Sequence, residues 1–323
     1  MSHIQTVINN KRDVKVLVIG DVILDQYLWT HVSRVSPEAP VPVCRVDTTS
    51  HVLGGAGNVV NNLKVLGASV SVASIIGKDT YGSQIQDLLQ SQQIDTQFLG
   101  TYDNVASICK ARVVAGGQQV CRLDYELEDS NVSLYVEDLI NAISTHIGDY
   151  QCVVISDYNK GVVSHELCRA VIDIANEHQV PVIVDPKHEQ VSKYAGATYI
   201  TPNMAEFKLM AGGAVLDTDQ NIESVAKRML EDHDLDNILL TRSADGMSLF
   251  NATETQHFPT SVSEVVDITG AGDTVVAALA YGVALGLGQA TIITFANGAA
   301  GVVVSKVGTS NASLNEIQAH DSV

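Results

Sequence analysis

Basic residues, aromatic residues and cysteines are all scarce in this sequence of 323 residues. The 19 Lys and Arg residues stand against 37 Asp and Glu residues, so the net charge is −18. A chain this acidic excludes nucleic acid or an anionic membrane surface as its main partner. No apolar run is long enough to span a bilayer, since the longest, 275–287, is broken by Tyr281 and two glycines.

The five cysteines are odd in number, which favours free thiols in a reducing compartment. They form no C-x-x-C pair, so the sequence has no zinc-ligand spacing. No two histidines stand four residues apart and no G-x-S-x-G motif occurs, which argues against histidine or serine chemistry. The N-terminus lacks the apolar stretch of a signal peptide. We therefore expect a cytoplasmic protein.

Short β-branched runs alternate with helical segments along most of the chain. This alternation predicts an α/β fold with parallel strands covered by helices. The segments 58–66 and 164–177 repeat apolar residues at helical spacing, and 274–287 is small and apolar throughout, as a buried helix should be. The expected strands are 16–19, 71–76, 152–155, 182–184, 198–200 and 238–240.

Polar residues follow these strands where they end, and ligands bind at the carboxyl ends of strands in open α/β sheets. We therefore expect one long active-site edge, carrying Asp21, Ser156, Asp157, Asp185, Asn203, Thr241 and Arg242.

Two stretches, 41–46 and 107–123, have β character but no helix directly after them. The second contains Gly116-Gly117, a hairpin signal. We interpret them as a small antiparallel β lid, near residues 30–50 and 105–124. Without internal repeats or a separating linker, the chain is expected to form one domain over residues 1–323.

The strongest site motif is Gly270-Ala-Gly-Asp273, between a strand-like run and the expected buried helix. Free backbone amides at such a helix start suit a phosphate oxygen. Asp273 would repel a phosphate unless a substrate hydroxyl lies between them, and in that case it can accept the hydroxyl proton. The alternative is a simple Asp N-cap on a glycine turn.

Gly54-Gly-Ala-Gly-Asn58 is a second glycine cluster, suited to close approach of a sugar. Taken alone it is more often a flexible turn with an Asn N-cap, and no strand is expected to lead straight into it. Asn203-x-x-Glu206 also has two interpretations. It is more often a capping box at a helix start, and the alternative is a pair of side chains that orients Mg²⁺ and phosphate. Taken alone, Asp185-Pro-Lys187 and 241–246 are weak indications of a functional site, since a strand end and an ordinary turn explain them.

Together these motifs resemble the ribokinase/PfkB family of sugar kinases in order and spacing over the whole chain. Within that family the match narrows to the heptose-7-phosphate kinases of lipopolysaccharide precursor synthesis. The segments that carry this narrower resemblance are 33–42 (SRVSPEAPVP), 110–115 (KARVVA), 156–161 (SDYNKG) and Asp185-Pro-Lys187.

The resemblance implies a ribokinase-like, doubly wound, mostly parallel sheet with helices on both faces and a β lid. It implies ATP- and Mg²⁺-dependent transfer to the anomeric hydroxyl of D-glycero-β-D-manno-heptose 7-phosphate, giving the 1,7-bisphosphate. Asp273 would be the catalytic base, and the amides of Gly270, Ala271, Gly272 and Asp273 would form the anion hole.

The resemblance also distributes the remaining site residues and implies a homodimer formed through the lid. Glu206 would hold Mg²⁺ through water, and Asp267 and Thr269 lie where relatives can hold K⁺. The sugar side would comprise Asp25, Gly54, Gly55 and Asn58, and the nucleotide side Asn203, Glu206, Thr241, Arg242, Gly246, Gly270, Gly272 and Asn297.

Five of the 19 cations lie in loops or strand ends that should border this cleft: Arg34, Lys110, Arg112, Lys160 and Lys187. A dianionic sugar phosphate needs such partners, whereas a neutral sugar does not. The alternatives are a kinase of ribose, fructose or fructose phosphate, and a non-catalytic sugar-phosphate sensor. The H-x-G-H signature of the nucleotidylyltransferase domain that some relatives add is absent, so a kinase-only chain is expected.

Overall fold

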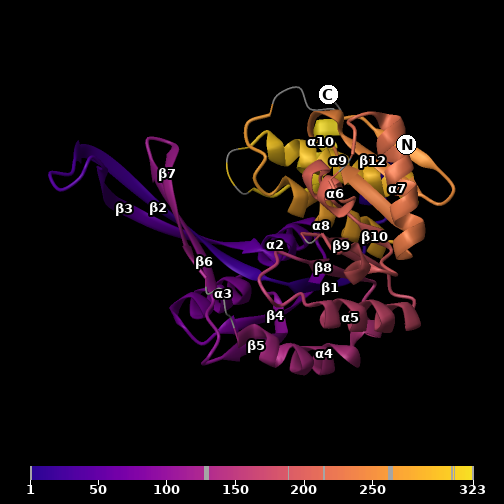
Figure 1. Ribbon diagram of the computed structural model, residues 1–323, viewed down its shortest axis with the longest axis horizontal. Helices are drawn as coiled ribbons and strands as arrows, with labels where there is room; N and C mark the ends of the chain where they lie inside the picture. The colour runs from indigo at the N-terminus through magenta and orange to yellow at the C-terminus, as the bar shows by residue number, and fades with distance from the viewer. Residues whose placement is uncertain are drawn as a thin grey trace.

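The computed structural model describes residues 2–126, 131–187, 189–213, 215–260, 265–306, 308 and 310–321. Its strands form two sheets (Figure 1). The larger sheet runs parallel from β11 to β5, and β12 and β13 extend it antiparallel. In spatial order it contains β13 (Thr255–Phe258), β12 (Met247–Asn251), β11 (Asn237–Thr241), β10 (Tyr199–Ile200), β9 (Val182–Asp185), β8 (Cys152–Ser156), β1 (Lys15–Gly20), β4 (Ser69–Gly77) and β5 (Asp95–Tyr102).

The larger sheet is buried on both faces because its central strands are apolar at most positions. Successive side chains of a strand point to opposite faces. In β1, Val16 and Val18 join one hydrophobic cluster, whereas Leu17 and Ile19 join the other. This confirms the expected doubly wound α/β fold.

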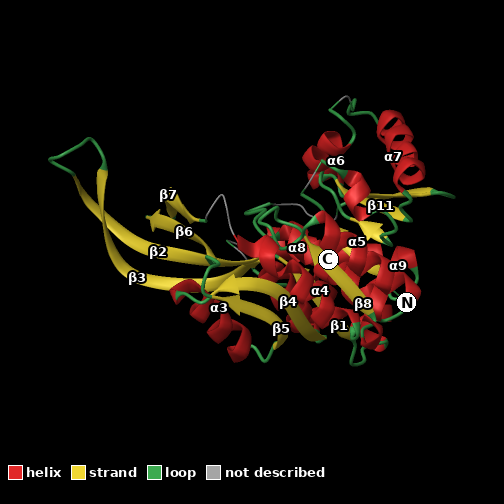
Figure 2. Ribbon diagram, turned by 60° about the horizontal axis from the view of Figure 1, so that its bottom comes forward, coloured by secondary structure: helices red, strands yellow, loops and turns green. Residues whose placement is uncertain are grey.

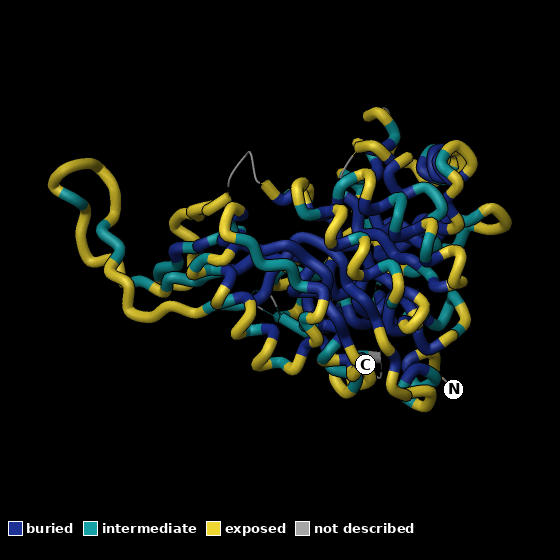
Figure 3. Tube along the Cα trace, turned by 90° about the horizontal axis from the view of Figure 1, so that it is seen from below, coloured by how far each residue is buried: buried dark blue, intermediate teal, exposed yellow. Residues whose placement is uncertain are grey.

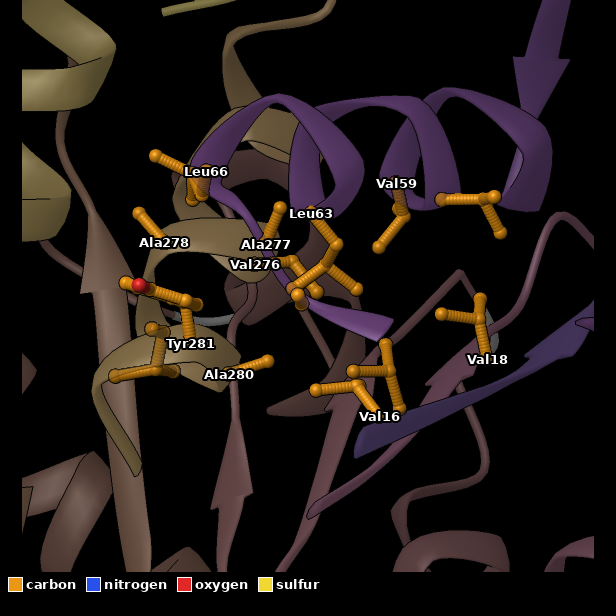
Figure 4. Close-up of a cluster of buried hydrophobic side chains, with 14 of the residues drawn as sticks. Val16, Val18, Val59, Leu63, Leu66, Val276, Ala277, Ala278, Ala280 and Tyr281 are labelled. Atoms are coloured by element: carbon orange, nitrogen blue, oxygen red, sulfur yellow. The ribbon is translucent and has the colours of Figure 1, made fainter. Parts of the chain in front are cut away.

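Helices from distant parts of the sequence cover each face. On one face α2 and α8 pack together above β1, as Figure 4 shows for Val18, Val59 and Leu63. This face is covered by α1 (His3–Asn9), α2 (Ala56–Leu66), α3 (Thr80–Ser91), α8 (Ala271–Ala284), α9 (Gln289–Val304) and α10 (Leu314–Asp321), and the other by α4 (Val136–Ser144), α5 (His165–Glu177), α6 (Met204–Met210) and α7 (Asp219–His233).

The smaller sheet, which we call the lid, projects from the body of the molecule (Figures 1 and 2). Its inner ends are buried, but its outer half is exposed (Figure 3). Both hairpins are antiparallel, as expected, yet they meet along a parallel pair, β2 with β6. The lid strands are β3 (Pro42–Gly55), β2 (Val22–Val35), β6 (Ile108–Ala115) and β7 (Gln118–Tyr125).

The boundaries differ from the sequence expectation mainly around the lid. The short strand expected at 41–46 is part of the much longer β3. β2 begins at Val22, directly after Asp21, and only its outer residues fall in the lid segment expected near 30–50. Helix α8 begins at Ala271, three residues earlier than expected, because Gly270 makes the turn with a φ of +79°.

Within the described ranges no helix combines the length and hydropathy needed to cross a membrane. All five cysteines are free thiols.

Candidate active site

The carboxyl ends of the parallel strands meet the start of α8 in a polar hollow of about 210 Å³. This is the edge that the sequence pattern predicts, since residues from β9, β10 and β11 all reach it. Its lining contains Tyr158, Asp185, Lys187, Thr201, Asn203, Glu206, Thr241, Gly270, Gly272 and Asp273.

Asp273 accepts hydrogen bonds from side chains of two other elements in this hollow. It sits in the first turn of α8, whose N-cap is Gly270, so the alternative of an Asp273 N-cap is wrong. Asn58 Nδ2 donates to Asp273 Oδ2 over 2.7 Å, and the hydroxyl of Tyr158 donates to Oδ1 over 2.7 Å. Burial raises the pKa of Asp273, and these two hydrogen bonds oppose that rise. The carboxylate is therefore oriented at both oxygens.

The glycine cluster at 54–58 ends one lid strand and begins a helix. Contrary to expectation, β3 runs directly into it, and α2 follows at Ala56 with Gly55 as N-cap. Asn58 is therefore inside the helix, and its N-cap interpretation is wrong. Gly55 has a φ of +59°, which favours glycine, and a Cβ on Gly54 would lie 2.3 Å from Asp25 Oδ2.

Asp25 and Arg112 join two neighbouring lid strands. Arg112 Nη1 donates to Asp25 Oδ1 over 2.5 Å, and its guanidinium lies 5.4 Å from the centre of the Tyr27 ring. Both charged side chains are largely buried. A buried, paired guanidinium with donors to spare suits a second anion.

Three further cations gather between the lid and the loop after β8. Burial lowers the pKa of Lys110, and the positive charges of Lys160 and Arg122 lower it further. Lys160 Nζ lies 2.8 Å from Glu126 Oε2. Lys160 and Glu126 also line a larger hollow of about 510 Å³ beside the inner end of the lid. Arg122 was missed from the sequence, although its alternation with Asp124 on β7 was a signal.

Arg34 is not brought to this cluster. It lies in the exposed outer part of β2, seven residues beyond Tyr27, which pairs with Arg112. At strand spacing that is about 23 Å. The five cations that the sequence analysis grouped are therefore not all in one place, because the outer part of β2 carries Arg34 away from the other four.

Asn203 and Glu206 form the capping box of α6, so the plain interpretation of this motif is confirmed. Glu206 also pairs with Lys187, which lies in the hollow beside Asp273 and not with the lid cations. The motif therefore builds the helix start and at the same time presents a carboxylate to the hollow.

Asp185, at the end of β9, is a buried carboxyl that the sequence analysis placed on the active-site edge without giving it a chemical role. Burial raises its pKa to about 8, with Lys187 opposing the rise. Among the described residues no set of three or more acidic, His or Cys side chains is arranged to hold a metal. Mg²⁺ does not need one, because it takes one or two carboxylates together with phosphate oxygens and water. Asp185 and Glu206 fit that requirement.

The expected nucleotide side is spread over neighbouring loops. Thr241 reaches the hollow, whereas Arg242 Nη2 lies 2.8 Å from Asp219 Oδ1 and lines a separate hollow of about 700 Å³. Asn297 Nδ2 donates to the Pro259 carbonyl over 2.8 Å. Gly246 has a φ of +81°, and a Cβ there would lie 2.1 Å from the Phe258 carbonyl oxygen.

Asp267 and Thr269, the expected cation pair, bond to each other. Asp267 Oδ1 accepts from the Thr269 amide over 2.9 Å and from its hydroxyl over 2.7 Å. Asp267 Oδ2 accepts from the Gly308 amide over 2.9 Å. These bonds hold the loop before α8 and lower the pKa of Asp267.

The sequence profile of the pfkB family of carbohydrate kinases matches residues 13–316. The chain belongs to this family. Its members transfer a phosphoryl group to an alcohol, so this PfkB protein is a carbohydrate kinase. It is 42% identical over 305 residues to "Bifunctional protein HldE" of Geobacter sulfurreducens and 39% identical over 307 residues to that of Sulfurimonas denitrificans.

These alignments cover 94% and 95% of the chain but only 62% and 64% of the two relatives, so the PfkB chain spans less than two thirds of their length. Among solved structures, a ribokinase of Arabidopsis thaliana complexed with ribose and ATP superposes with a TM-score of 0.74 at 17% identity, covering 96% of this chain and 99% of that one. Phosphofructokinase-2 of Escherichia coli, in complex with potassium, superposes with a TM-score of 0.77 at 17% identity, covering 96% of this chain and 98% of that one. These structures confirm the ribokinase-like fold.

Proposed function

We propose that this PfkB protein uses ATP and Mg²⁺ to phosphorylate the anomeric hydroxyl of D-glycero-β-D-manno-heptose 7-phosphate in the cytoplasm, supplying lipopolysaccharide precursors. The observation that carries the choice of a phosphorylated sugar is the cation cluster at the inner end of the lid. Burial lowers the pKa of Lys110, and the positive charges of Lys160 and Arg122 lower it further, so an anion placed beside Lys110 offsets that repulsion. The identity to HldE proteins over most of the chain supports the heptose.

In the proposed reaction Asp273 takes the proton of the acceptor hydroxyl as the hydroxyl oxygen bonds to the terminal phosphorus of ATP. The bond from that phosphorus to the bridging oxygen breaks, and ADP leaves. The amides from Gly270 to Asp273 receive the charge on the transferring group. Mg²⁺, held through Asp185 and Glu206, neutralises phosphate charge when bound.

The other site residues keep the roles that the family resemblance implies. Asp25, Gly54, Gly55, Asn58 and Arg112 form the sugar side. Thr241, Arg242, Gly246 and Asn297 form the nucleotide side, with K⁺ at Asp267 and Thr269 as an activator.

We also propose that residues 1–323 act as one kinase unit and that two copies associate through their lids. The outer lid exposes large apolar side chains, including Trp29, Val35 and Leu123. Sedimentation analysis of the wild type and of Trp29→Glu tests this: a dimer that the substitution dissociates supports it, and a wild-type monomer contradicts it.

The first experiment is phosphorus NMR of the protein with ATP, Mg²⁺ and the heptose 7-phosphate, with fructose 6-phosphate in a parallel sample. A new anomeric phosphate signal from the heptose alone, with ADP formed in step, supports the proposal. Turnover of fructose 6-phosphate instead keeps a PfkB sugar kinase and overturns the substrate. No ADP from either sugar favours another acceptor or a non-catalytic sensor.

A further inference from the structure

The loop after β8 places the side chain of Tyr158 against Asp273, and the proposed reaction gives this tyrosine no role. Tyr158 lines the hollow, and its hydroxyl donates to Asp273 Oδ1 over 2.7 Å. Its ring lies beneath Lys187, with Nζ 5.7 Å from the ring centre. Tyr158 therefore contacts both the proposed base and the nearest cation.

A buried carboxylate fixes the backbone of this loop. Asp21 Oδ2 accepts from the amides of Tyr158 and Lys160 over 3.0 and 3.2 Å, and Oδ1 accepts from the Val162 amide over 3.0 Å. Three amide donors on one carboxylate leave the loop little freedom. Asp21 thus acts on the site only through the loop.

The start of the loop is fixed independently by Asp157. Its carboxylate accepts from Lys193 over 2.6 Å and from the Tyr194 hydroxyl over 2.7 Å, all in the buried interior. Asn159, two residues on, has a φ of +54° and donates its amide to Asp157 Oδ1 over 2.8 Å. The position of Tyr158 is therefore set by buried contacts on both sides of it.

The charges around Asp273 make a neutral donor valuable there. Burial raises the pKa of the Tyr158 hydroxyl, and the charge of Asp273 raises it further, so the hydroxyl keeps its proton and donates. Lys187 is the cation that favours ionised Asp273, and Asp25 opposes it. The groups facing Asp273 are Asn58 of α2, Tyr158 of the loop, Asp185 at the end of β9, Lys187 just beyond it, and Asp25 of the lid.

We infer that Tyr158 is a positioning residue for phosphoryl transfer: its hydroxyl, with the Asn58 amide, holds the Asp273 carboxylate oriented and ionised for the acceptor hydroxyl. This inference rests on the proposed role of Asp273 as the base. With Oδ1 held by Tyr158 and Oδ2 by Asn58, the carboxylate cannot rotate freely. Each oxygen keeps a further lone pair for the incoming hydroxyl.

The test compares Tyr158→Phe with the wild type in the pH dependence of kcat/KM for the acceptor sugar. The substitution keeps the ring under Lys187 and removes only the donor. Loss of one charge-assisted hydrogen bond should move the acid limb of the profile up by about 1 pH unit. The rate should recover at high pH, and the KM for ATP should stay within about twofold of the wild-type value.

Tyr150→Phe is the matched control. Its hydroxyl donates to Ser71 Oγ over 2.9 Å, is buried, and lies before β8, at the amino end of the sheet. Removing this hydroxyl should leave the acid limb in place. A limb that moves equally in both variants, or a Tyr158→Phe rate that falls by the same factor at every pH, overturns the positioning role.

Asp273→Asn separates this inference from the proposed function. If Asp273→Asn keeps wild-type turnover, the proposed base itself is wrong and the inference falls with it. If Asp273→Asn loses turnover while Tyr158→Phe has a wild-type profile, only the inference about Tyr158 is overturned. If Asp273→Asn loses turnover and the limb moves in Tyr158→Phe alone, both stand.

Discussion

The two sheets of this PfkB kinase share the site but are built in opposite ways. The larger sheet is covered by helices on both faces, and the buried end of β9 places Asp185 in the same hollow as Asp273. The lid has a buried inner end and an exposed outer half. In the proposed reaction the base Asp273 is thus held against the buried sheet, whereas the proposed sugar-binding groups Asp25 and Arg112 lie on the lid.

Strand β3 links the two regions. Its outer residues are exposed, its last three are buried, and it passes directly into α2, which carries Asn58 to Asp273. Gly54 stands at this junction, against Asp25. This one segment therefore contacts Asp25 at Gly54 and carries Asn58 to Asp273.

The largest effect should come from Asp273→Asn, on the rigid side. The amide cannot take a proton, so kcat should fall by about 10²–10⁴, while the KM values for both substrates change little. Steady-state kinetics with the heptose 7-phosphate measures this. Asp149→Asn, an exposed carboxylate beyond the amino end of β8, is the control and should keep the wild-type kcat.

The difference in burial between the larger sheet and the lid can be tested by comparing the free energy of unfolding of one core variant with that of one lid variant. Leu63 of α2 is fully buried, whereas Leu123 of β7 is 43% exposed. Leu63→Ala should lower the free energy of unfolding by about 2–5 kcal/mol, and Leu123→Ala by less than about 0.5 kcal/mol. Urea denaturation measures both. An equal loss from Leu123→Ala would break the comparison, because it would mean that the lid is buried in an assembly.

Arg112→Ala addresses substrate recognition by the lid. The variant loses a paired guanidinium at the inner end of the lid, so the KM for the sugar phosphate should rise by about tenfold or more, on the scale of one charge-assisted bond. The KM for ATP should not change. Arg45→Ala is the control, since Arg45 is 77% exposed and lies 3.6 Å from Asp47 on the outer lid. Equal changes in the two KM values would remove Arg112 from the sugar side.

The smallest effect should come from Glu316→Gln, on a helix outside both sheets. Hydrogen bonds from Lys306, and then from the Ser313 amide, lower the pKa of Glu316 from 4.5 to about 2. A lowered pKa stabilises the fold above the unfolded value, and this stability is lost as the pH falls from 4.5 towards 2. Urea midpoints of the variant and the wild type should differ slightly at pH 6 and converge near pH 2. A difference that persists at low pH contradicts this account.

Much of the larger sheet could be predicted from the sequence because its strands are short, apolar and bounded by polar residues. Each of the six expected strands overlaps an observed one, from β1 to β11. The lid was predicted less well, since β2 and β3 are mixed in polarity and their outer halves follow no burial pattern. Alternation is informative only where one face of a strand is buried.

Candidate site residues with local signatures could also be found from the sequence. Gly270, Asn203 and Glu206 stand in turn and capping patterns that depend on neighbours within a few residues. Tyr158 and Asn58 have no such signature for their contact with Asp273, because that partner is distant in the chain. Tyr158 is 115 residues from Asp273, and Asn58 is 215 residues from it.

The sequence by itself determined six parallel strands of the larger sheet, the helices α2, α5 and α8, and where polar residues follow buried strands. These features depend on apolar periodicity, glycine conformations and caps, all of which act over a few residues. Only the tertiary structure decided that Asn58 and Tyr158 both bond to Asp273, that Lys187 joins Glu206, and that Arg34 lies away from the other cations. Those contacts depend on how strands far apart in the chain are ordered in the sheets, and hydrophobic packing of the whole chain sets that order.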